Sequence, residues 1–385
     1  MSDFIYLDHA AATPLDNVVL EAMMPYFSDK FYNPSSPYSP AVEVKRDYQN
    51  AKQRIAQALG VGADELVMTA GATESINLAF SASYQRNLVA NIEHQSVVEA
   101  AKKLNRTIFV EADHKGFISP ELVKRELATG VSMVSIALAN HELGTIQPIA
   151  EIAEIVKNER ERRRLINDKT PLLFHTDASQ ALSLVDVKPN RLGVDLLTLS
   201  ASKIYGPKQV GLLWVRPGIK LKPSIVGGGQ EAGLRSGTEN VAGVIGFAVA
   251  VELASKRREG EIRRLKVFRD KLATELLTSC PDMVISSDNK KSLVSYLNVS
   301  FPGIDAERLV FKLESKGVLV ATGSACSANK GNQSTVLRAI GLDNQLIDGS
   351  LRLTLGRLTS ESDVEQASKL IIEAVQQEKA RLNGS

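Results

Sequence analysis

Side chains capable of chemistry follow several apolar, strand-like runs of the sequence, at the point where each run ends. These residues are His94, Asn140, His141, Asp177, Gln180, Ser200 and Lys203. A hydrophobic core would favour none of these residue types. If the runs are neighbouring strands of one sheet, their ends bring imidazoles, a carboxylate, amides and an amine to one edge. We therefore predict a single site there.

The combination of groups suits pyridoxal phosphate. This cofactor needs a lysine for covalent attachment and an acid beside its pyridine nitrogen, and it also needs a phosphate cup and a flat stacking partner. Lys203, Asp177, the turn Gly71–Thr73 and His94 would fill these needs. The turn opens a helical pattern, where backbone N–H groups and the helix dipole favour a phosphate. An ordinary N-cap by Thr73 explains the same residues equally well.

A different class of enzyme also matches Lys203. Ser200-Ala-Ser-Lys203 fits the Ser-x-x-Lys motif of penicillin-binding proteins and β-lactamases, and Ser287–Asn289 fits their second motif. In that class the serine opens a helix. Here a strand-like run leads in, and Gly206-Pro207 follow too soon for a helix to continue. The third motif, Lys-Thr-Gly, does not occur in the sequence. We reject this interpretation.

The elements that must position these residues alternate between strands and helices. The predicted strands are Glu65–Thr69, Asn87–Asn91, Thr107–Glu111, Ser132–Leu138, Leu172–Thr176, Leu196–Leu199 and Gly211–Val215. Helical patterns such as Ser96–Leu104 and Ile149–Arg163 lie between them. This alternation predicts an α/β fold with a mainly parallel seven-stranded sheet flanked by helices. Ligands of such sheets bind at the carboxyl ends of the strands.

A smaller C-terminal α/β domain is predicted after the sheet. A charged helix over Glu252–Thr278 leads into a region with few strands, and the last helix covers Glu361–Arg381. We expect a large cofactor-binding domain over residues 15–255. Residues 1–14 and 256–385 would form the small domain.

Composition excludes several function classes. The chain of 385 residues is 44% hydrophobic and 23% charged, which is typical of a globular protein, and its net charge of +2 gives no broad basic field for nucleic acid. Its two cysteines exclude a disulfide framework and a cysteine-based zinc site, and we expect no metal. No signal peptide and no apolar run long enough for a membrane are evident, so we expect a cytoplasmic protein.

Across nearly its whole length, the chain resembles the cysteine desulfurases of the NifS/IscS type. These are fold-type I pyridoxal phosphate enzymes of the class V aminotransferase family. The matching stretches are YLDHAAATP (Tyr6–Pro14), TAGATESINLA (Thr69–Ala79), EHQSVVE (Glu93–Glu99), ANHELGTIQP (Ala139–Pro148), HTDASQ (His175–Gln180), SASKIYGPKQVG (Ser200–Gly211), GGGQEAGLRSGTEN (Gly227–Asn240), GSACS (Gly323–Ser327) and LRLTLGR (Leu351–Arg357). Nine matches in order are far more specific than any single motif.

The resemblance implies a role for each matching residue at the cofactor. Lys203 would be the covalent anchor, Asp177 would pair with the pyridinium nitrogen, and Gln180 would reach the phenolic oxygen. His94 would stack on the ring. The implied phosphate contacts are Ala72, Thr73, Ser200, Ser202 and, from a partner subunit of a homodimer, Thr238.

The resemblance also implies the reaction. Arg352 would bind the carboxylate of L-cysteine in a bidentate fork, with Asn140 beside the substrate. Cys326, in a polar stretch of small residues where nothing would bury it, would take the sulfur as a persulfide and leave L-alanine, with His94 as a candidate to take the thiol proton. Cys280, at the end of a helical pattern, is expected to be a small buried hydrophobe. The sulfur would pass to an iron–sulfur scaffold or a tRNA-thiolating enzyme.

Three of the motifs depart from the family pattern. Ser202 stands where relatives have a histidine, and His141 stands where they have a second asparagine beside the cofactor. Tyr38 and Ala41 occupy the usual histidine and glycine sites after Asn33–Ser36. A serine hydroxyl and an imidazole can still donate hydrogen bonds, so we expect phosphate binding to survive. These departures leave open an impaired homologue that acts as a binding protein. A selenocysteine lyase or another class V aminotransferase-like enzyme could use the same lysine and aspartate, so these alternatives also stay open.

Overall fold

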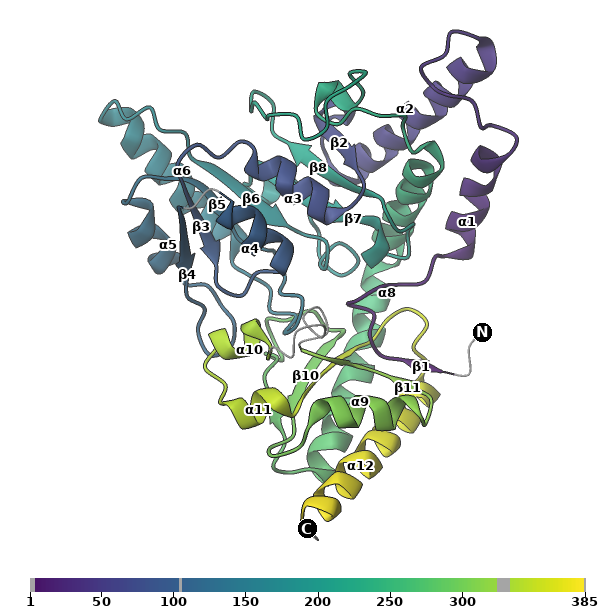
Figure 1. Cartoon of the computed structure of the whole chain (residues 1–385), viewed down its shortest axis with the longest axis vertical. Helices are drawn as coiled ribbons and strands as arrows, with labels where there is room; N and C mark the ends of the chain where they lie inside the picture. The colour runs from purple at the N-terminus through teal and green to yellow at the C-terminus, as the bar shows by residue number, and fades with distance from the viewer. Residues whose placement is uncertain (1–3, 104–105, 324–332, 384–385) are drawn as a thin grey trace.

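A seven-stranded sheet forms the centre of the computed structural model, which describes residues 4–103, 106–323 and 333–383 (Figure 1). The strands lie in the order β2-β8-β7-β6-β5-β3-β4, and only β8 runs antiparallel to its neighbours. Their bounds are β2 (Leu66–Thr69), β3 (Arg86–Ala90), β4 (Thr107–Val110), β5 (Val131–Ser135), β6 (Leu173–Asp177), β7 (Leu196–Ser200) and β8 (Gly211–Val215). The predicted α/β class and mainly parallel sheet are confirmed. The run predicted to reach Leu138 ends as a strand at Ser135.

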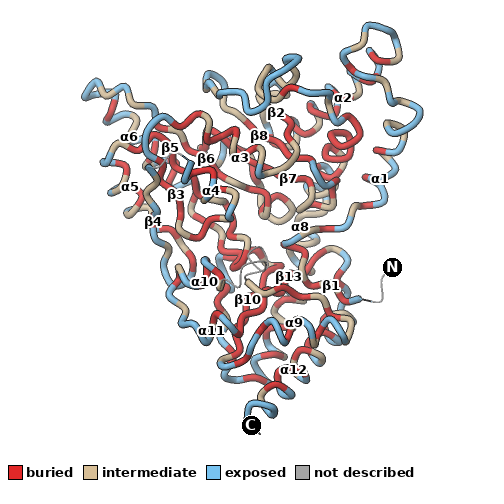
Figure 2. The backbone as a smooth tube through the Cα atoms, in the orientation of Figure 1, coloured by how far each residue is buried: buried red, intermediate tan, exposed pale blue. Residues whose placement is uncertain are grey.

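Helices cover both faces of this sheet, which explains why its strands are apolar on both sides. Val67 of β2 packs toward α3 (Ala72–Phe80) and α4 (Gln95–Lys102), whereas its neighbour Leu66 packs into the core on the other face. The helices that contribute to that second core include α2 (Ser39–Leu59), α5 (Pro120–Leu127), α6 (Ile149–Leu165) and the first part of α8 (Val241–Ser279). Figure 2 shows the sheet buried between these layers.

A separate hydrophobic core lies around a four-stranded antiparallel sheet of order β12-β13-β10-β9. Its elements are β9 (Val284–Ile285), β10 (Tyr296–Ser300), α9 (Ala306–Glu314), β12 (Ala321–Thr322), β13 (Ser350–Thr354) and α12 (Glu361–Asn383). The N-terminal strand β1 (Ile5–Tyr6) pairs in parallel with β11 (Val318–Leu319) and joins this core. Two short helices, α10 (Thr335–Ala339) and α11 (Asn344–Asp348), lie toward the large sheet (Figure 1).

Helix α8 connects the two cores. Its buried residues from Val241 to Val251 belong to the core beside the large sheet, and those from Leu265 to Leu276 belong to the other core. The helix predicted to begin at Glu252 therefore begins at Val241, because the preceding apolar run forms its first turns. The domain boundaries near residues 15 and 255 stay a prediction.

Candidate functional site

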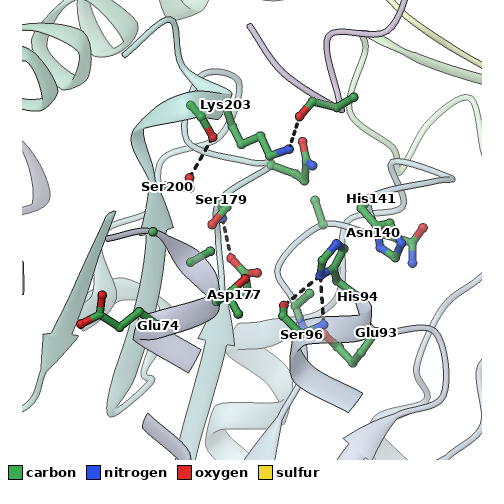
Figure 3. A pocket seen from close by; sticks show the side chains of 18 of the residues that line it. Glu74, Glu93, His94, Ser96, Asn140, His141, Asp177, Ser179, Ser200 and Lys203 are labelled. Carbon is green, nitrogen blue, oxygen red and sulfur yellow. Dashed lines mark hydrogen bonds between the residues drawn. The ribbon is translucent and has the colours of Figure 1, made fainter. Parts of the chain in front are cut away.

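A cavity of about 750 Å³ opens at the carboxyl ends of β2, β3, β5, β6 and β7 (Figure 3). The predicted site residues that line it are Ala72, Thr73, His94, Asn140, His141, Asp177, Gln180, Ser200, Ser202 and Lys203. The structure thus brings together side chains that are far apart in the sequence. A parallel sheet aligns its strand ends in this way, and a ligand site at that edge is expected.

Lys203 lies at the end of a short 3₁₀ turn (Ala201–Lys203) directly after β7. Its Nζ donates hydrogen bonds to the carbonyl oxygens of Ala10 and Ala11, at 2.8 and 2.6 Å. Ser200 ends β7 and precedes only this three-residue 3₁₀ turn, so it does not open an α-helix, and Ser287 accepts a hydrogen bond from the backbone of Asn298 outside this cavity. These placements agree with the rejection of the Ser-x-x-Lys interpretation.

The start of α3 and two serines form one end of the cavity. Gly71 is the N-cap residue of α3 at φ 140°, and no side chain caps the helix. The alternative that Thr73 is the N-cap is wrong, because Thr73 lies inside the first turn. The first N–H groups of a helix have no partner within it, so they suit an anion. Beside them, the hydroxyls of Ser200 and Ser202 lie 3.1 Å apart.

Asp177, the last residue of β6, and Gln180 just after it also line the cavity. Asp177 accepts a hydrogen bond from the backbone N–H of Ser179 at 2.9 Å, which fixes its carboxylate at the end of β6. Gln180 donates to the carbonyl of Ala10 at 3.1 Å and accepts from the hydroxyl of Tyr296 at 2.8 Å. The amide of Gln180 has a second N–H and a second acceptor lone pair, so it can contact a ligand while it keeps both partners.

The imidazoles of His94 and His141 are in edge-to-face contact in the cavity, with ring centroids 5.1 Å apart and an angle of 79° between the planes. His94 caps α4, and its Nδ1 accepts a hydrogen bond from the backbone N–H of Ser96 at 3.2 Å. Neutral His94 therefore carries its proton on Nε2. Burial lowers the pKa of His94, and the charges of Lys203 and Arg352 act in the same direction, against that of Asp177. We conclude that this imidazole is neutral near pH 7.

Two buried carboxyl groups stand next to these histidines in the sequence and were given no role by the sequence analysis. Burial raises the pKa of Glu93 to about 8, although its Oε1 accepts a hydrogen bond from the backbone N–H of Ala137 at 2.7 Å. Burial raises the pKa of Glu142 to about 7, and Ser334 donates to Glu142 Oε2 at 2.6 Å. In both motifs a glutamate is adjacent to a histidine of the site, and this adjacency could have predicted that Glu93 and Glu142 lie near it.

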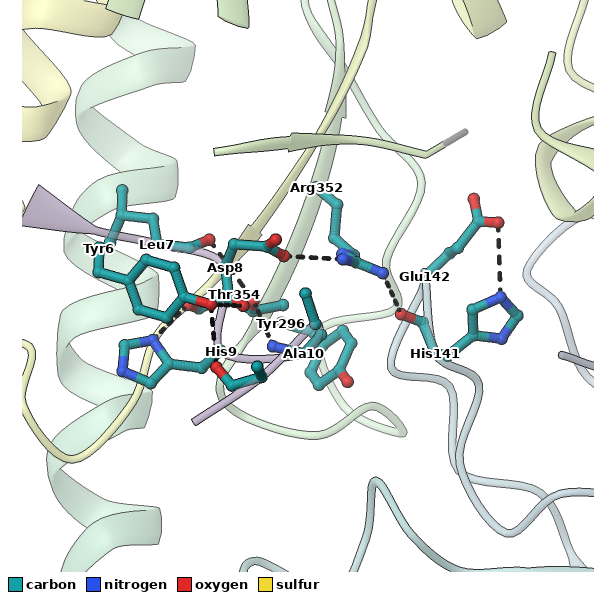
Figure 4. A network of polar contacts seen from close by, with 12 residues as sticks. Tyr6, Leu7, Asp8, His9, Ala10, His141, Glu142, Tyr296, Arg352 and Thr354 are labelled. Carbon is teal, nitrogen blue, oxygen red and sulfur yellow. Dashed lines mark hydrogen bonds and ion pairs between the residues drawn. The ribbon is translucent and has the colours of Figure 1, made fainter. Parts of the chain in front are cut away.

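Arg352 lies on β13, behind His141, and does not line the cavity (Figure 4). Its guanidinium forms an ion pair with Asp8 at 2.7 Å and donates to the carbonyl of His141 at 3.0 Å. Its buried Nε has no hydrogen-bond partner among the described residues. Asp8, which holds this arginine, belongs to a matching motif but was not predicted to act at the site.

One further predicted residue does not line the cavity, and another lies outside the residues that the structure describes. Thr238 is exposed and is absent from the lining, whereas the prediction places it in a partner's site. Cys326 lies outside the described residues, so its position is not given. Cys280 is buried, as expected for a small apolar residue.

The residues of the cavity fit pyridoxal phosphate. An amine, a carboxylate, hydroxyl groups and a helix N-terminus line one space, whose volume is within the range of ~300–1,000 Å³ usual for cofactor sites. Within the described ranges, no cluster of three or more His, Cys, Asp or Glu residues could hold a metal ion. In the same ranges, no helix has the length and apolar character needed to cross a membrane.

Comparison with known proteins gives consistent matches over nearly the whole chain. The class-V aminotransferase family model matches residues 5–367. The chain is 38% identical over 377 residues to cysteine desulfurase IscS 1 of Archaeoglobus fulgidus, with 95% of each chain covered. It is 38% identical over 371 residues to cysteine desulfurase IscS of Dictyoglomus turgidum, covering 94% of this chain and 91% of that one.

Solved structures show the same likeness. A NifS-like protein superposes with a TM-score of 0.89 at 32% identity, covering 97% of this chain and 99% of that chain. SspA in complex with cysteine superposes with a TM-score of 0.77 at 30% identity, covering 91% and 98%.

Proposed function

The chain belongs to the class-V aminotransferase family, as a pyridoxal phosphate-dependent cysteine desulfurase of the NifS/IscS type, and we propose that the cavity at the strand ends is its active site. One observation carries this proposal. Lys203, Asp177, His94 and the start of α3 line a single cavity, although they come from four different parts of the sequence. We propose that this site takes L-cysteine and releases L-alanine, as the cysteine complex of SspA also suggests.

Each group in the cavity would contact a different part of the cofactor. Lys203 would hold it covalently, Asp177 would keep a proton on its ring nitrogen, and the α3 start with Ser200 and Ser202 would bind its phosphate. The imidazole of His94 would lie against the ring. When bound, pyridoxal phosphate supplies an electron sink for the carbon atoms of the amino acid.

Arg352 is the proposed partner of the cysteine carboxylate. Its unpartnered Nε and the neighbouring Nη2, now on Asp8, form an edge with the fork geometry that a carboxylate prefers. The carbonyl of His141 fixes the other nitrogen, so the guanidinium plane is held before the substrate arrives. Asn140 supports the same loop, because it accepts hydrogen bonds from the backbone of Glu142 and Leu143, each at 2.8 Å.

Lys203 and Cys326 are the proposed reacting residues. We assign removal of the α-proton of cysteine to Lys203 Nζ, which two backbone carbonyls hold in the cavity. The thiolate of Cys326 would attack the sulfur of cysteine, so that the S–S bond of a persulfide forms as the C–S bond breaks. The thiolate is required, because a thiol is a poor nucleophile.

Alanine release from cysteine tests this proposal, with the chain's other cysteine as the matched control. Cys326→Ser is expected to abolish alanine release while it retains cofactor absorbance. Cys280→Ser changes a buried thiol outside the cavity and is expected to leave turnover within about twofold. Full alanine release by Cys326→Ser would contradict the proposal.

We further propose a homodimer. Apolar side chains are exposed along α1 (Asn17–Met23), the 3₁₀ helix that follows it and the loop before Thr238. They are Val18, Leu20, Met24, Phe27, Ile225 and Val226. A second copy that covered this surface would place Thr238 against another subunit. Sedimentation analysis would give the mass of a dimer if this is right and of a monomer if it is wrong.

The sulfur acceptor is proposed only by class. A cytoplasmic iron–sulfur scaffold or a tRNA-thiolating enzyme would take the persulfide sulfur. Transfer to candidate acceptors, followed by mass spectrometry, distinguishes the two.

A further inference from the structure

The net reaction needs a proton acceptor that His94 does not provide in its observed state. One thiol must lose a proton, and the side-chain carbon of cysteine must gain one when its C–S bond breaks, since alanine has a methyl group. His94 Nδ1 already accepts the N–H of Ser96, so its neutral ring carries a proton on Nε2. It can donate from that nitrogen but has no free lone pair there.

His141 is the other imidazole of the cavity. An imidazole can bind and release a proton near neutral pH, so its residue type suits acid–base chemistry. Its Nε2 lies 3.6 Å from Glu142 Oε1, and this contact is drawn in Figure 4. The distance is too long for a hydrogen bond, but a small rotation of either side chain would form one.

Glu142 is a buried carboxyl group with one fixed oxygen. Ser334, the N-cap residue of α10, donates to Oε2, while Oε1 faces His141. The two oxygens therefore have separate partners, one structural and one that can exchange a proton. Burial raises the pKa of Glu142 to about 7, so both protonation states are available near neutral pH.

We propose that His141 is a second acid–base residue of this active site and that the Glu142 carboxylate is its proton partner. This inference rests on the proposed function. The S–H bond of a reacting thiol breaks, its electron pair stays on sulfur, and the proton binds Nδ1 of His141. The proton on Nε2 then passes to Glu142 Oε1. The reverse transfer supplies the proton that the side-chain carbon gains as its bond to sulfur breaks.

The surrounding charges favour this route over a stable imidazolium. Burial is the main cause that lowers the pKa of His141 well below its usual value, and the charges of Arg352 and Lys203 act in the same direction. A proton that enters His141 is therefore passed on. Arg352 lowers the pKa of Glu142, as does the Ser334 hydrogen bond, while Asp8 neutralises part of the arginine's charge. With a pKa of about 7, Glu142 can both bind and release a proton near neutral pH.

The pH dependence of turnover tests the proposal on the holoenzyme. The wild-type kcat for alanine formation is expected to rise through an apparent pKa near 7, as the Glu142 carboxylate forms. Glu142→Gln is expected to abolish this rise of kcat with pH. His141→Asn is expected to lower kcat by about 100-fold with little change in KM. Ser334→Ala is the matched control. It keeps the carboxyl group of Glu142 but removes a hydrogen bond to the carboxylate, so the rise of kcat should move to higher pH.

A second readout does not depend on turnover. The chain has five histidines, so an NMR spectrum of protein labelled with ¹³C at histidine Cε1 has few signals. The signal that His141→Asn removes belongs to His141. That signal should shift with pH near neutrality in the wild type and in Glu142→Asp, and should not shift in Glu142→Gln.

Three results would overturn the inference. They are a kcat of His141→Asn within twofold of wild type, a rise of KM alone in His141→Asn, and a rise of kcat near pH 7 that persists in Glu142→Gln. The desulfurase function would still hold in each case if the wild type forms alanine and Cys326→Ser does not. Glu142→Asp and the spectrum keep the test valid if Glu142→Gln does not fold.

Discussion

Gly211→Ala tests how closely β8 must approach the start of α3. A Cβ at residue 211 would lie 2.7 Å from both the Cα and the C atom of Gly71, and 2.8 Å from the carbonyl oxygen of Leu199. Carbon atoms pack at about 3.5–4.0 Å, so the Gly71 backbone would have to move by about 1 Å. All three atoms belong to backbone, so no side-chain rotation can relieve the contact.

The expected cost has two parts. Over-packing of this kind destabilises a protein by about 1–3 kcal/mol. The shift also displaces the α3 N–H groups that we assign to the cofactor phosphate. Loss of one hydrogen bond to a charged group costs about 1.5–3 kcal/mol, which corresponds to roughly 10- to 100-fold weaker cofactor binding.

Thermal unfolding and titration of the apoenzyme with pyridoxal phosphate measure both effects. Gly260→Ala is the control, because Gly260 lies within α8 and a Cβ there would meet no atom within 4 Å. It should stabilise the helix by up to about 1 kcal/mol and leave cofactor affinity unchanged. Wild-type stability and affinity in Gly211→Ala would refute the reasoning.

Three further predictions address single groups of the site. Arg352→Lys loses one of the two hydrogen bonds proposed for the cysteine carboxylate, so KM should rise about 10- to 100-fold with kcat unchanged; an unaltered KM contradicts this role. Ser202→Ala removes a phosphate donor and should weaken cofactor binding about tenfold, measured by absorbance titration, whereas equal affinity excludes the contact. Because burial raises the pKa of Glu93 to about 8, the folded state binds that proton more tightly than the unfolded state. The free energy of unfolding should fall by about 1.4 kcal/mol per unit between about pH 5 and pH 8 from this group, and denaturation of Glu93→Gln should lack that decline.

The location of the site could be predicted because local sequence pattern determines where strands end. His94, Asp177 and Lys203 each follow an apolar run, and parallel strands align their ends at one sheet edge. The seven strands were located for the same reason. The start of α8 was missed because its first turns are apolar all round, a pattern that alone does not separate a buried helix from a strand.

The polar network behind the cavity could not be predicted from sequence pattern. Asp8 meets Arg352 across 344 positions, and Glu142 meets Ser334 across 192. Such contacts depend on how the N-terminal segment packs beside β13 and how α10 packs against the core of the large sheet, not on local propensity. The tautomer of His94 could not be predicted from the sequence either, because it depends on the hydrogen bond that Nδ1 accepts at the N-cap of α4.

The central claim is that sulfur from cysteine reaches Cys326, and mass spectrometry of peptides after one turnover with isotope-labelled cysteine tests it most directly. The account predicts one labelled sulfur atom on the peptide that contains Cys326 and none on the peptide that contains the buried Cys280. The Cys326 label should be lost in Lys203→Ala. Label on Cys280, or alanine formed with no label on Cys326, would contradict the account.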